Sequence, residues 1–448
     1  MSRSAMLPLL ASLALAIAAV STAHAADTAS IPVSTFATLP LIAPLNPGNP
    51  EGMTADDSGL LHVNTFDTSN ICFTLPSAAA AVVNASTPYT GSAELQQFLQ
   101  SHQNANSTPP PANTFNYIFT YDRHGRLVTQ TPFVPCGAPL GMQSVGDKLY
   151  VIDVFYGQVN RYRLPLTGTS TPDATYNVCG GFLVAFGLPV KNTGPFCALN
   201  DIKLGPDGRL YIADNGAGFP FVFSFNFETG RIWELNPVDG SSSIFYSDPA
   251  LNVDPNSAPP FGVAAAVFDP SGKHLYMSNF SSNYVFRVRV RATNSDEPPS
   301  PSNPLVPPAG SPPIFYYNPS ILSGPNHMAF DDDDHLWITS GENNQVVELD
   351  TEEGEVLATA GSFCGLTSAG APKCLLQPAN IVKLGHAMYV DNEANPGLNC
   401  LNTEAGPPGS LVPAGLPPLC GSGTPSPTWT NLKLYTISRF VLNKAGGR

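Results

Sequence analysis

A short β-hairpin pattern recurs six times along this 448-residue chain and limits the folds open to it more than any other property. Each copy has an apolar alternating run, a turn of Asp, Gly, Ser or Pro, and a second apolar run such as LYVID or LYIAD. Alternation at period two predicts strands, and a D-G or S-G pair predicts the hairpin turn between them. The copies begin at Glu51, Leu140, Asn200, Ala264, Asn326 and Ala379.

Further strands follow several of these hairpins, at 159–164, 231–236, 284–290 and 345–349. Four strands per repeat are typical of a propeller blade, so the sequence predicts an all-β, six-bladed β-propeller. A β-sandwich with chance similarity between hairpins is the alternative, and the recurring (D/S)-G-x-L-Y pattern argues against it. We expect the last strand, 432–441, to pair with the N-terminal run 31–41, because such closure removes sheet edges.

Three segments do not fit a blade and are interpreted as long loop insertions, at about 70–113, 296–313 and 394–430. The chain has 46 prolines and 38 glycines, residues that favour turns over regular structure, and these residues are frequent in the three segments. The expected domain organisation is therefore one propeller over residues 26–448 with these three insertions.

The first 25 residues read as a signal peptide. Arg3 supplies a positive charge, residues 7–20 are apolar, and Ala23-His24-Ala25 is a small-x-small cleavage signal. A membrane anchor is the alternative, but no stop-transfer run follows and no later apolar segment is long enough to cross a bilayer. We expect a secreted or periplasmic protein.

The eight cysteines form an even set, which in an exported chain indicates disulfides. There is no C-x-x-C pair, which argues against zinc knuckles and thioredoxin-type sites. Pairing sequence neighbours gives the expected bridges Cys179–Cys197, Cys364–Cys374 and Cys400–Cys420, with Cys72–Cys136 left as the fourth.

The net charge of −14 argues against nucleic acid as a partner, because no basic stripe is present to meet a phosphate backbone. An acidic surface is compatible with cations, sugars and neutral small molecules. We expect a monomer that takes a small-molecule ligand or substrate in its central channel.

The repeat also predicts which side chains meet in that channel, because the first strand of each blade lines it. Polar residues stand at or next to the starts of several repeats: Glu51, Asn200, Asp201, Asn326 and His327. Convergent oxygen donors suit a hard cation such as calcium or magnesium, and an imidazole would also admit zinc, manganese or iron. The alternative is that these residues cap turns or bind channel water.

Two other acidic features have structural interpretations. Asp153 and Asp214 end their strands and are expected to accept hydrogen bonds from the turns that follow. The run Asp331–Asp334 occupies the hairpin-turn position of its repeat and lacks the glycine and distal glutamate of a calcium-binding EF-hand loop. We therefore interpret it as a solvated turn.

The repeats Asn200-Asp201-IKLGPDGRLYIAD and PSGKHLYMSN, together with Glu51-Gly52, resemble the SMP-30/gluconolactonase/luciferin-regenerating-enzyme family of six-bladed propellers. Strictosidine-synthase-like and NHL propellers are more distantly similar. The resemblance covers about residues 45–395. It implies a divalent-metal site in the channel, calcium first among the candidates, at which sugar lactones or related esters are opened by a polarised carbonyl and a carboxylate-activated water.

Carried over position by position, the resemblance places the family's glutamate ligand at Glu51 and its Asn-Asp asparagine at Asn200. Its third ligand position falls on Ala264 and its catalytic aspartate on Asn279. The metal ligands expected in this chain are Glu51, Asn200, Asn279 and Asn326. Because an asparagine cannot act as a base, Asp201 and His327 are the candidate catalytic residues.

Three functions therefore stand open. The first is a metal-dependent hydrolase of a lactone or ester. The second is a non-catalytic propeller that binds a ligand or a protein, since the aspartate position is Asn279 and a ligand position is Ala264. The third is a lyase or oxidoreductase that uses His327. The fold does not decide between them.

Overall fold

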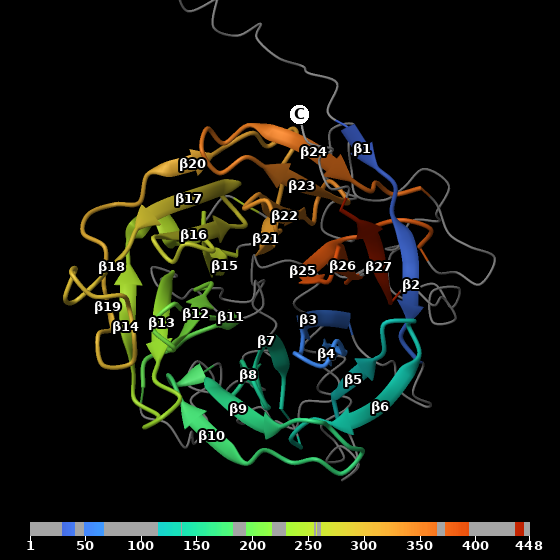
Figure 1. Ribbon diagram of the computed structural model, residues 1–448, viewed down its shortest axis with the longest axis horizontal. Coiled ribbons are helices and arrows are strands. Elements are labelled where there is room, and N and C mark those ends of the chain that lie inside the picture. The colour runs from blue at the N-terminus through green and yellow to red at the C-terminus, as the bar shows by residue number, and fades with distance from the viewer. Residues whose placement is uncertain are drawn as a thin grey trace, which may run out of the picture.

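Six sheets stand around a central axis in the computed structural model as blades of a propeller (Figure 1): five have four antiparallel strands, and one has four antiparallel strands and a fifth, parallel strand at its edge. The structure describes residues 29–40, 49–66, 115–135, 137–181, 194–216, 230–254, 257, 261–364, 372–393 and 435–442. The expected six-bladed, all-β fold is confirmed. The expected signal peptide, the insertions at 70–113 and 394–430, and Cys72, Cys136, Cys400 and Cys420 lie outside the described residues.

The first three blades follow the chain from the innermost strand outward. Blade 1 consists of β3 (Asn49–Ala55), β4 (Leu61–Phe66), β5 (Tyr117–Tyr121) and β6 (Leu127–Pro132). Blade 2 consists of β7 (Pro139–Val145), β8 (Lys148–Asp153), β9 (Gln158–Arg163) and β10 (Ala174–Asn177). Blade 3 consists of β11 (Leu199–Leu204), β12 (Leu210–Asp214), β13 (Arg231–Leu235) and β14 (Ser242–Ser247), and a short 3-10 helix, η2 (Pro249–Leu251), follows it.

The remaining blades include strands from distant parts of the chain. Blade 4 consists of β15 (Val263–Phe268), β16 (His274–Asn279), β17 (Tyr284–Arg289) and β20 (Ile314–Tyr316). Blade 5 consists of β21 (Pro325–Phe330), β22 (Leu336–Ser340), β23 (Gln345–Leu349) and β24 (Val356–Ala360), with β1 (Ala29–Ile31) added at its edge. Blade 6 consists of β25 (Pro378–Leu384), β26 (Ala387–Asn392), β27 (Thr436–Val441) and β2 (Ser34–Thr38).

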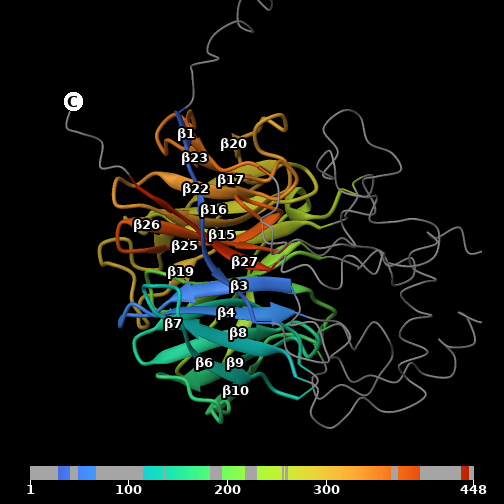
Figure 2. The same cartoon turned by 90° about the vertical axis from the view of Figure 1, so that its right-hand side faces the viewer.

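The N-terminal segment joins the last two blades (Figures 1 and 2). Strand β2 pairs antiparallel with β27, which confirms the expected closure of the ring, and β1 pairs parallel with β24 of blade 5. The same short segment therefore supplies the outer edge of both blades. This arrangement covers two sheet edges that would otherwise be unpaired.

The segment expected as an insertion at 296–313 connects β17 to β20 and includes part of a small hairpin of β18 (Arg291–Ala292) and β19 (Leu305–Val306). It packs on blade 3: the backbone N–H of Leu305 donates to the carboxylate of Asp207, and the hydroxyl of Tyr246 donates to the carbonyl of Gly310. The insertion thus braces the neighbouring blade.

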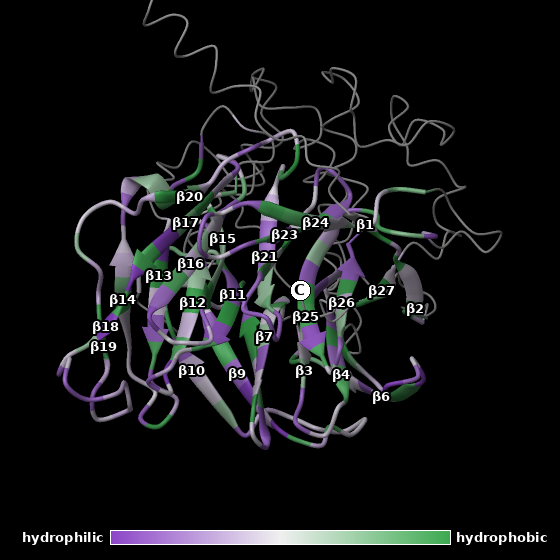
Figure 3. Ribbon diagram, turned by 45° about the horizontal axis from the view of Figure 1, so that its top comes forward, coloured by the Kyte–Doolittle hydropathy of each residue, from purple (hydrophilic) through white to green (hydrophobic). Residues whose placement is uncertain are grey.

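The hydrophobic core lies largely between neighbouring blades. One cluster joins β8 of blade 2 to β11 and β12 of blade 3 through Ile152, Ile202 and Ile212, all fully buried. Figure 3 shows the hydrophobic stretches along the strands around the ring. Because each blade buries its faces against the next, the strands carry near-continuous apolar runs such as LYIAD, in which every residue is buried.

Two disulfides cross from the outermost strand of one blade toward the innermost strand of the next. Cys179–Cys197 lies between β10 and β11, and Cys364–Cys374 lies between β24 and β25. Both pairings were expected from the spacing of the cysteines and are confirmed. Among the described residues, no helix is long and apolar enough to cross a membrane.

Candidate functional site

Each innermost strand shifts its pairing register at the same place, by one extra residue relative to the second strand. Such a β-bulge re-aims the side chains on the bulged strand and is common next to functional sites. The residues at the first bulge position are Glu51, Leu140, Asn200, Ala264, Asn326 and Ala379, in blade order. The residues at the second bulge position are Gly52, Gly141, Asp201, Ala265, His327 and Asn380.

Side chains link neighbouring blades at this level of the channel. In five junctions a side chain donates to the backbone carbonyl at the first bulge position of another blade: Asn64 to Leu140, Asn200 to Ala264 (2.8 Å), Ser278 to Asn326 (2.6 Å), Thr339 to Ala379 (2.8 Å) and Asn380 to Glu51 (3.2 Å). These bonds hold the six bulges side by side around the channel. They confirm that residues far apart in sequence meet at the repeat starts.

Oxygen-bearing side chains occupy the first bulge position in alternate blades, namely Glu51, Asn200 and Asn326 of blades 1, 3 and 5. Asn326 is buried, and its Oδ1 atom has no hydrogen-bond partner among the described residues. Asn200 is also buried, and its Oδ1 accepts only a long bond, 3.4 Å, from the amide of Asn215. Glu51 is partly exposed.

The second bulge position carries a buried polar group built from Asp201, His327 and Asn380. Nδ1 of His327 lies 2.6 Å from Nδ2 of Asn380 and 3.3 Å from Oδ1 of Asp201. The ammonium of Lys203 donates to the same Asp201 oxygen at 2.8 Å. The opposite atoms of all three residues, Asp201 Oδ2, His327 Nε2 and Asn380 Oδ1, have no partner within the described part of the chain.

Negative charge gathers in this part of the channel. Burial, with the nearby carboxylates of Glu393, Asp391 and Asp201, raises the pKa of Glu51 well above its usual range. Burial and the charge of Glu393 likewise raise the pKa of Asp391, which accepts the backbone N–H of Asn380 at 2.6 Å. Burial also acts to raise the pKa of Asp201, but its close contacts, first among them the ammonium of Lys203, outweigh burial and lower that pKa to about 2.

These residues fit a hard divalent cation. The donors at the first bulge position are one carboxylate and two amide oxygens, the ligand chemistry that calcium and magnesium prefer. The buried Oδ1 atom of Asn326 lacks a partner in the described structure, and a cation would supply one. A cation would also offset the carboxylate charge that raises the pKa of Glu51.

Asn279 is placed elsewhere. It ends β16, where its Nδ2 donates to the carbonyls of Ala250 and Asn252 and its Oδ1 accepts from Ser281 and Ser282. Glu51, Asn200 and Asn326 thus share the first bulge position in three blades, whereas Asn279 binds the segment that contains Ala250 and Asn252.

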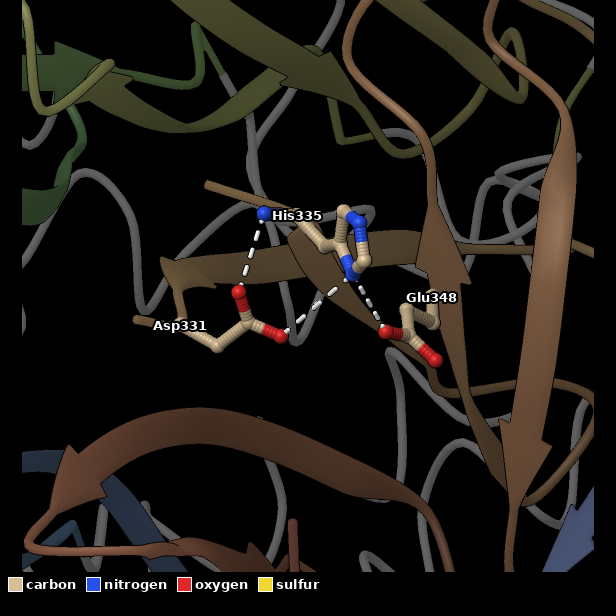
Figure 4. A group of neighbouring side chains, drawn as sticks. All are labelled: Asp331, His335 and Glu348. Atoms are coloured by element: carbon tan, nitrogen blue, oxygen red, sulfur yellow. Dashed lines mark hydrogen bonds and ion pairs between the residues drawn. The ribbon is translucent and has the colours of Figure 1, made fainter. Parts of the chain in front are cut away.

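A second group of metal-ligand type in blade 5 consists of Asp331 and His335, from the turn between β21 and β22, and Glu348, from β23 (Figure 4). Oδ1 of Asp331 accepts the backbone N–H groups of Asp333 and His335, and Oδ2 accepts the indole N–H of Trp337 at 2.8 Å. His335 Nδ1 lies 2.8 Å from Glu348. Both carboxylate oxygens of Asp331 are thus already engaged, as its interpretation as a turn residue requires.

A similar arrangement occurs in blade 3, where Arg209, which cannot ligate a metal, pairs with the glutamate in place of His335. Asp207 accepts the backbone N–H of Arg209 and the hydroxyl of Tyr211. The guanidinium of Arg209 forms an ion pair with Glu234 at 3.3 Å, as His335 pairs with Glu348. Glu234 and Glu348 occupy the same register position opposite the aromatic residue of the second strand. We therefore assign the blade 5 group to turn structure.

One residue of the channel was not singled out from the sequence: Lys203. Lys203 stands two residues after Asp201 on one strand, so both side chains share a face. The alternation of strand residues is the sequence signal that points to it. Asp391 lies opposite the bulge that carries Asn380.

The two acidic strand ends differ in their surroundings. Asp214 accepts the backbone N–H of Ala198 and also binds the guanidinium of Arg231 at 2.7 Å and the indole of Trp233 at 3.0 Å. Asp153 accepts the N–H of Ala138, but its Oδ2 has no partner among the described residues. Burial raises the pKa of Asp153 to about 7.

Asp153→Asn is expected to stabilise the protein above pH 7 and to flatten its pH dependence. The folded-state pKa of about 7 exceeds the ordinary value of 3.8, so this carboxyl favours folding most below about pH 4 and loses that contribution as the pH rises to 7. At about 1.4 kcal/mol per pH unit, the gain at pH 8 is about 2–4 kcal/mol.

Urea unfolding of wild type and variant at pH 5 and pH 8 measures this. The matched control is Asp214→Asn, which removes the partner of buried Arg231 and is expected to destabilise at both pH values. Equal stability changes for Asp153→Asn at the two pH values would contradict the assignment.

No known family model and no curated protein matches this sequence. Among solved structures, the chain is similar to a luciferin-regenerating enzyme, with 10% identity, 92% of this chain and 95% of that chain covered, and a TM-score of 0.49. The chain is also similar to a calcium-binding protein, regucalcin, from Agrobacterium tumefaciens, with 14% identity, 81% of this chain and 86% of that chain covered, and a TM-score of 0.46. For a gluconolactonase from Xanthomonas campestris the identity is 13%, the coverage is 62% of this chain and 79% of that chain, and the TM-score is 0.40. The propellers that the sequence resembles are thus among the structures to which this chain is similar.

Proposed function

We propose that the channel binds a small polar molecule together with a divalent cation, calcium in the first instance, and hydrolyses a lactone or ester. The observation that supports the proposal is the ring of bulges, in which Glu51, Asn200 and Asn326 stand at the same position of alternate blades and Asn326 Oδ1 is buried and unpartnered in the described structure. The motifs Glu51-Gly52 and Asn200-Asp201, on which the family resemblance rests, stand at these same positions.

Glu51, Asn200 and Asn326 would hold the cation, which when bound polarises a substrate carbonyl. The neighbouring residues act on the ligand directly. Asp201 stays ionised, because its close contacts, first among them the ammonium of Lys203, lower its pKa to about 2, and its Oδ2 can accept a hydrogen bond from a water or a ligand hydroxyl. His327 offers Nε2, which has no partner in the described structure, to a ligand oxygen.

A non-catalytic binding propeller is the second candidate, and two observations favour it. Ala264 occupies the first bulge position of blade 4, where the resemblance implies a ligand. Asp201, the carboxylate deepest in the site, has a pKa of about 2 and is therefore a poor proton acceptor at neutral pH. A ligand and a cation could still bind to such a channel.

The hydrolase proposal is tested by turnover of sugar lactones and aryl esters by the full chain, with calcium and after chelation. We expect chelation and the variant Asn326→Ala each to lower kcat/KM about 100-fold or more, because the polarising charge is lost. The matched control is Asn318→Ala, beyond β20 at the outer side of blade 4, which is expected to leave turnover unchanged. Turnover that survives chelation contradicts the cation's role, and calcium binding without turnover supports the binding propeller.

We further propose that residues 1–25 direct export to the periplasm or the medium. The two disulfides support this, since such bonds form and persist in oxidising compartments. Mass spectrometry of the exported protein is expected to place its N-terminus near Ala26. Recovery of the protein with residues 1–25 attached would contradict it.

A further inference from the structure

The imidazole of His327 stands at the second bulge position of blade 5 and is fully buried. Its two nitrogens differ in their surroundings. Nδ1 faces the amide of Asn380 at 2.6 Å, whereas Nε2 has no hydrogen-bond partner among the described residues. A neutral imidazole carries one proton, so its neighbours decide which nitrogen is the donor.

The orientation of the Asn380 amide is fixed by its second contact. The backbone carbonyl of Glu51 lies 3.2 Å from Asn380 Nδ2, and a carbonyl can only accept a hydrogen bond. The amide nitrogen must therefore face this carbonyl, and the second hydrogen of the same nitrogen is the one available to His327. Nδ1 then accepts, and the imidazole proton stays on Nε2.

Asp201 acts in the opposite direction, because its Oδ1 lies 3.3 Å from Nδ1 and would favour a proton there. That oxygen already accepts from the ammonium of Lys203 at 2.8 Å. The contact of Nδ1 with Asn380, at 2.6 Å, is also shorter than its contact with Asp201, at 3.3 Å. Lys203 thus weakens the one group that competes with Asn380 for the state of His327.

We propose that Asn380 is a positioning residue that holds His327 with Nδ1 as an acceptor and a proton on Nε2, and that this buried N–H forms a subsite for an acceptor oxygen of the ligand, a carbonyl or carboxylate oxygen. The inference deepens the proposed function and rests on it, since it places the ligand in the same channel. It assigns His327 the part of a hydrogen-bond donor to the ligand. A base at Nε2 would need the other tautomer.

The test is the tautomer of His327, read from long-range nitrogen–proton NMR correlations of the full, metal-free chain at pH 8, with His327→Gln used to assign the signals. We expect the Nε2–H form in about tenfold excess or more, and Asn380→Leu to abolish or reverse that excess. Wild-type His327 with its proton on Nδ1 would overturn the proposal. The tautomer measurement needs neither a cation nor turnover. The tautomer proposal can therefore fail while the hydrolase proposal holds, and the hydrolase proposal can fail while the tautomer proposal holds.

Acetate serves as a probe of the subsite itself. Adding acetate is expected to shift the His327 Nε2–H signal with saturation and to leave the signal of His62 unchanged, because both ring nitrogens of His62 are engaged by Asp56 and Thr120. A His327 signal that does not move overturns the subsite. If Asn380→Leu fails to fold, the wild-type tautomer and the acetate titration still decide.

Discussion

Deleting the chain through Thr38 is expected to abolish cooperative folding. The deletion removes β1 and β2, so β27 loses one of its two antiparallel partners and blade 6 is left with three strands and an open edge. It also removes Ala37, which is buried in the cluster that contains Tyr389 and Ile437. An open hydrophobic edge strand promotes aggregation. Thermal unfolding followed by circular dichroism, with sedimentation of the product, measures the result.

Two shorter deletions serve as controls. Removal of residues 1–28 takes away the expected signal peptide and leaves both strands, so stability is expected to be unchanged. Removal through Pro32 takes only β1, three residues paired with β24, and is expected to cost about 1–3 kcal/mol. A cooperative, monomeric protein after deletion through Thr38 would show that the ring does not depend on this closure.

Gly52→Ala carries the second large expected effect, a loss of about 3–5 kcal/mol. A Cβ atom at Gly52 would stand 2.0 Å from the carbonyl oxygen of Leu140 and 2.6 Å from Nδ2 of Asn64. The first of these is backbone, so blades 1 and 2 would have to separate. The bond from Asn64 to Leu140 that joins these blades would be lost as well.

Chemical denaturation of Gly52→Ala is compared with Gly168→Ala. At Gly168 the nearest atom to an added Cβ, the carbonyl oxygen of Gln130, is 3.7 Å away, so a change within about 0.5 kcal/mol is expected. If the two variants are equally stable, the close approach of the bulges at the channel is not a constraint on the fold.

The fold followed from the sequence because its signals are local. Each hairpin repeats an apolar alternation and a turn within about 15 residues, and closure needs only one strand at each end of the chain. The repeat starts also gave the bulge position that Glu51, Asn200 and Asn326 share. Two of the expected disulfides formed because their cysteines flank single blade junctions.

The remaining features depend on contacts between blades, which spacing does not encode. Asn380 meets His327 across 53 residues, and it meets the carbonyl of Glu51 across 329. The parallel pairing of β1 with blade 5 likewise leaves no periodic signal. Asn279 was expected at the site because it is the last residue of its strand, where the resemblance places an aspartate. In this propeller, polar residues at such strand ends bind adjoining backbone segments, as Asp214 and Asn279 both do.

Calorimetric titration of the full chain with calcium tests the central claim most directly, because the fold presents two groups of ligand type. One is the channel ring with Glu51, and the other is the blade 5 group with Glu348. We expect wild type to bind calcium, Glu51→Gln to lose that binding by about tenfold or more, and Glu348→Gln to keep it. Binding that survives Glu51→Gln, or that is lost only in Glu348→Gln, would contradict a cation site in the channel.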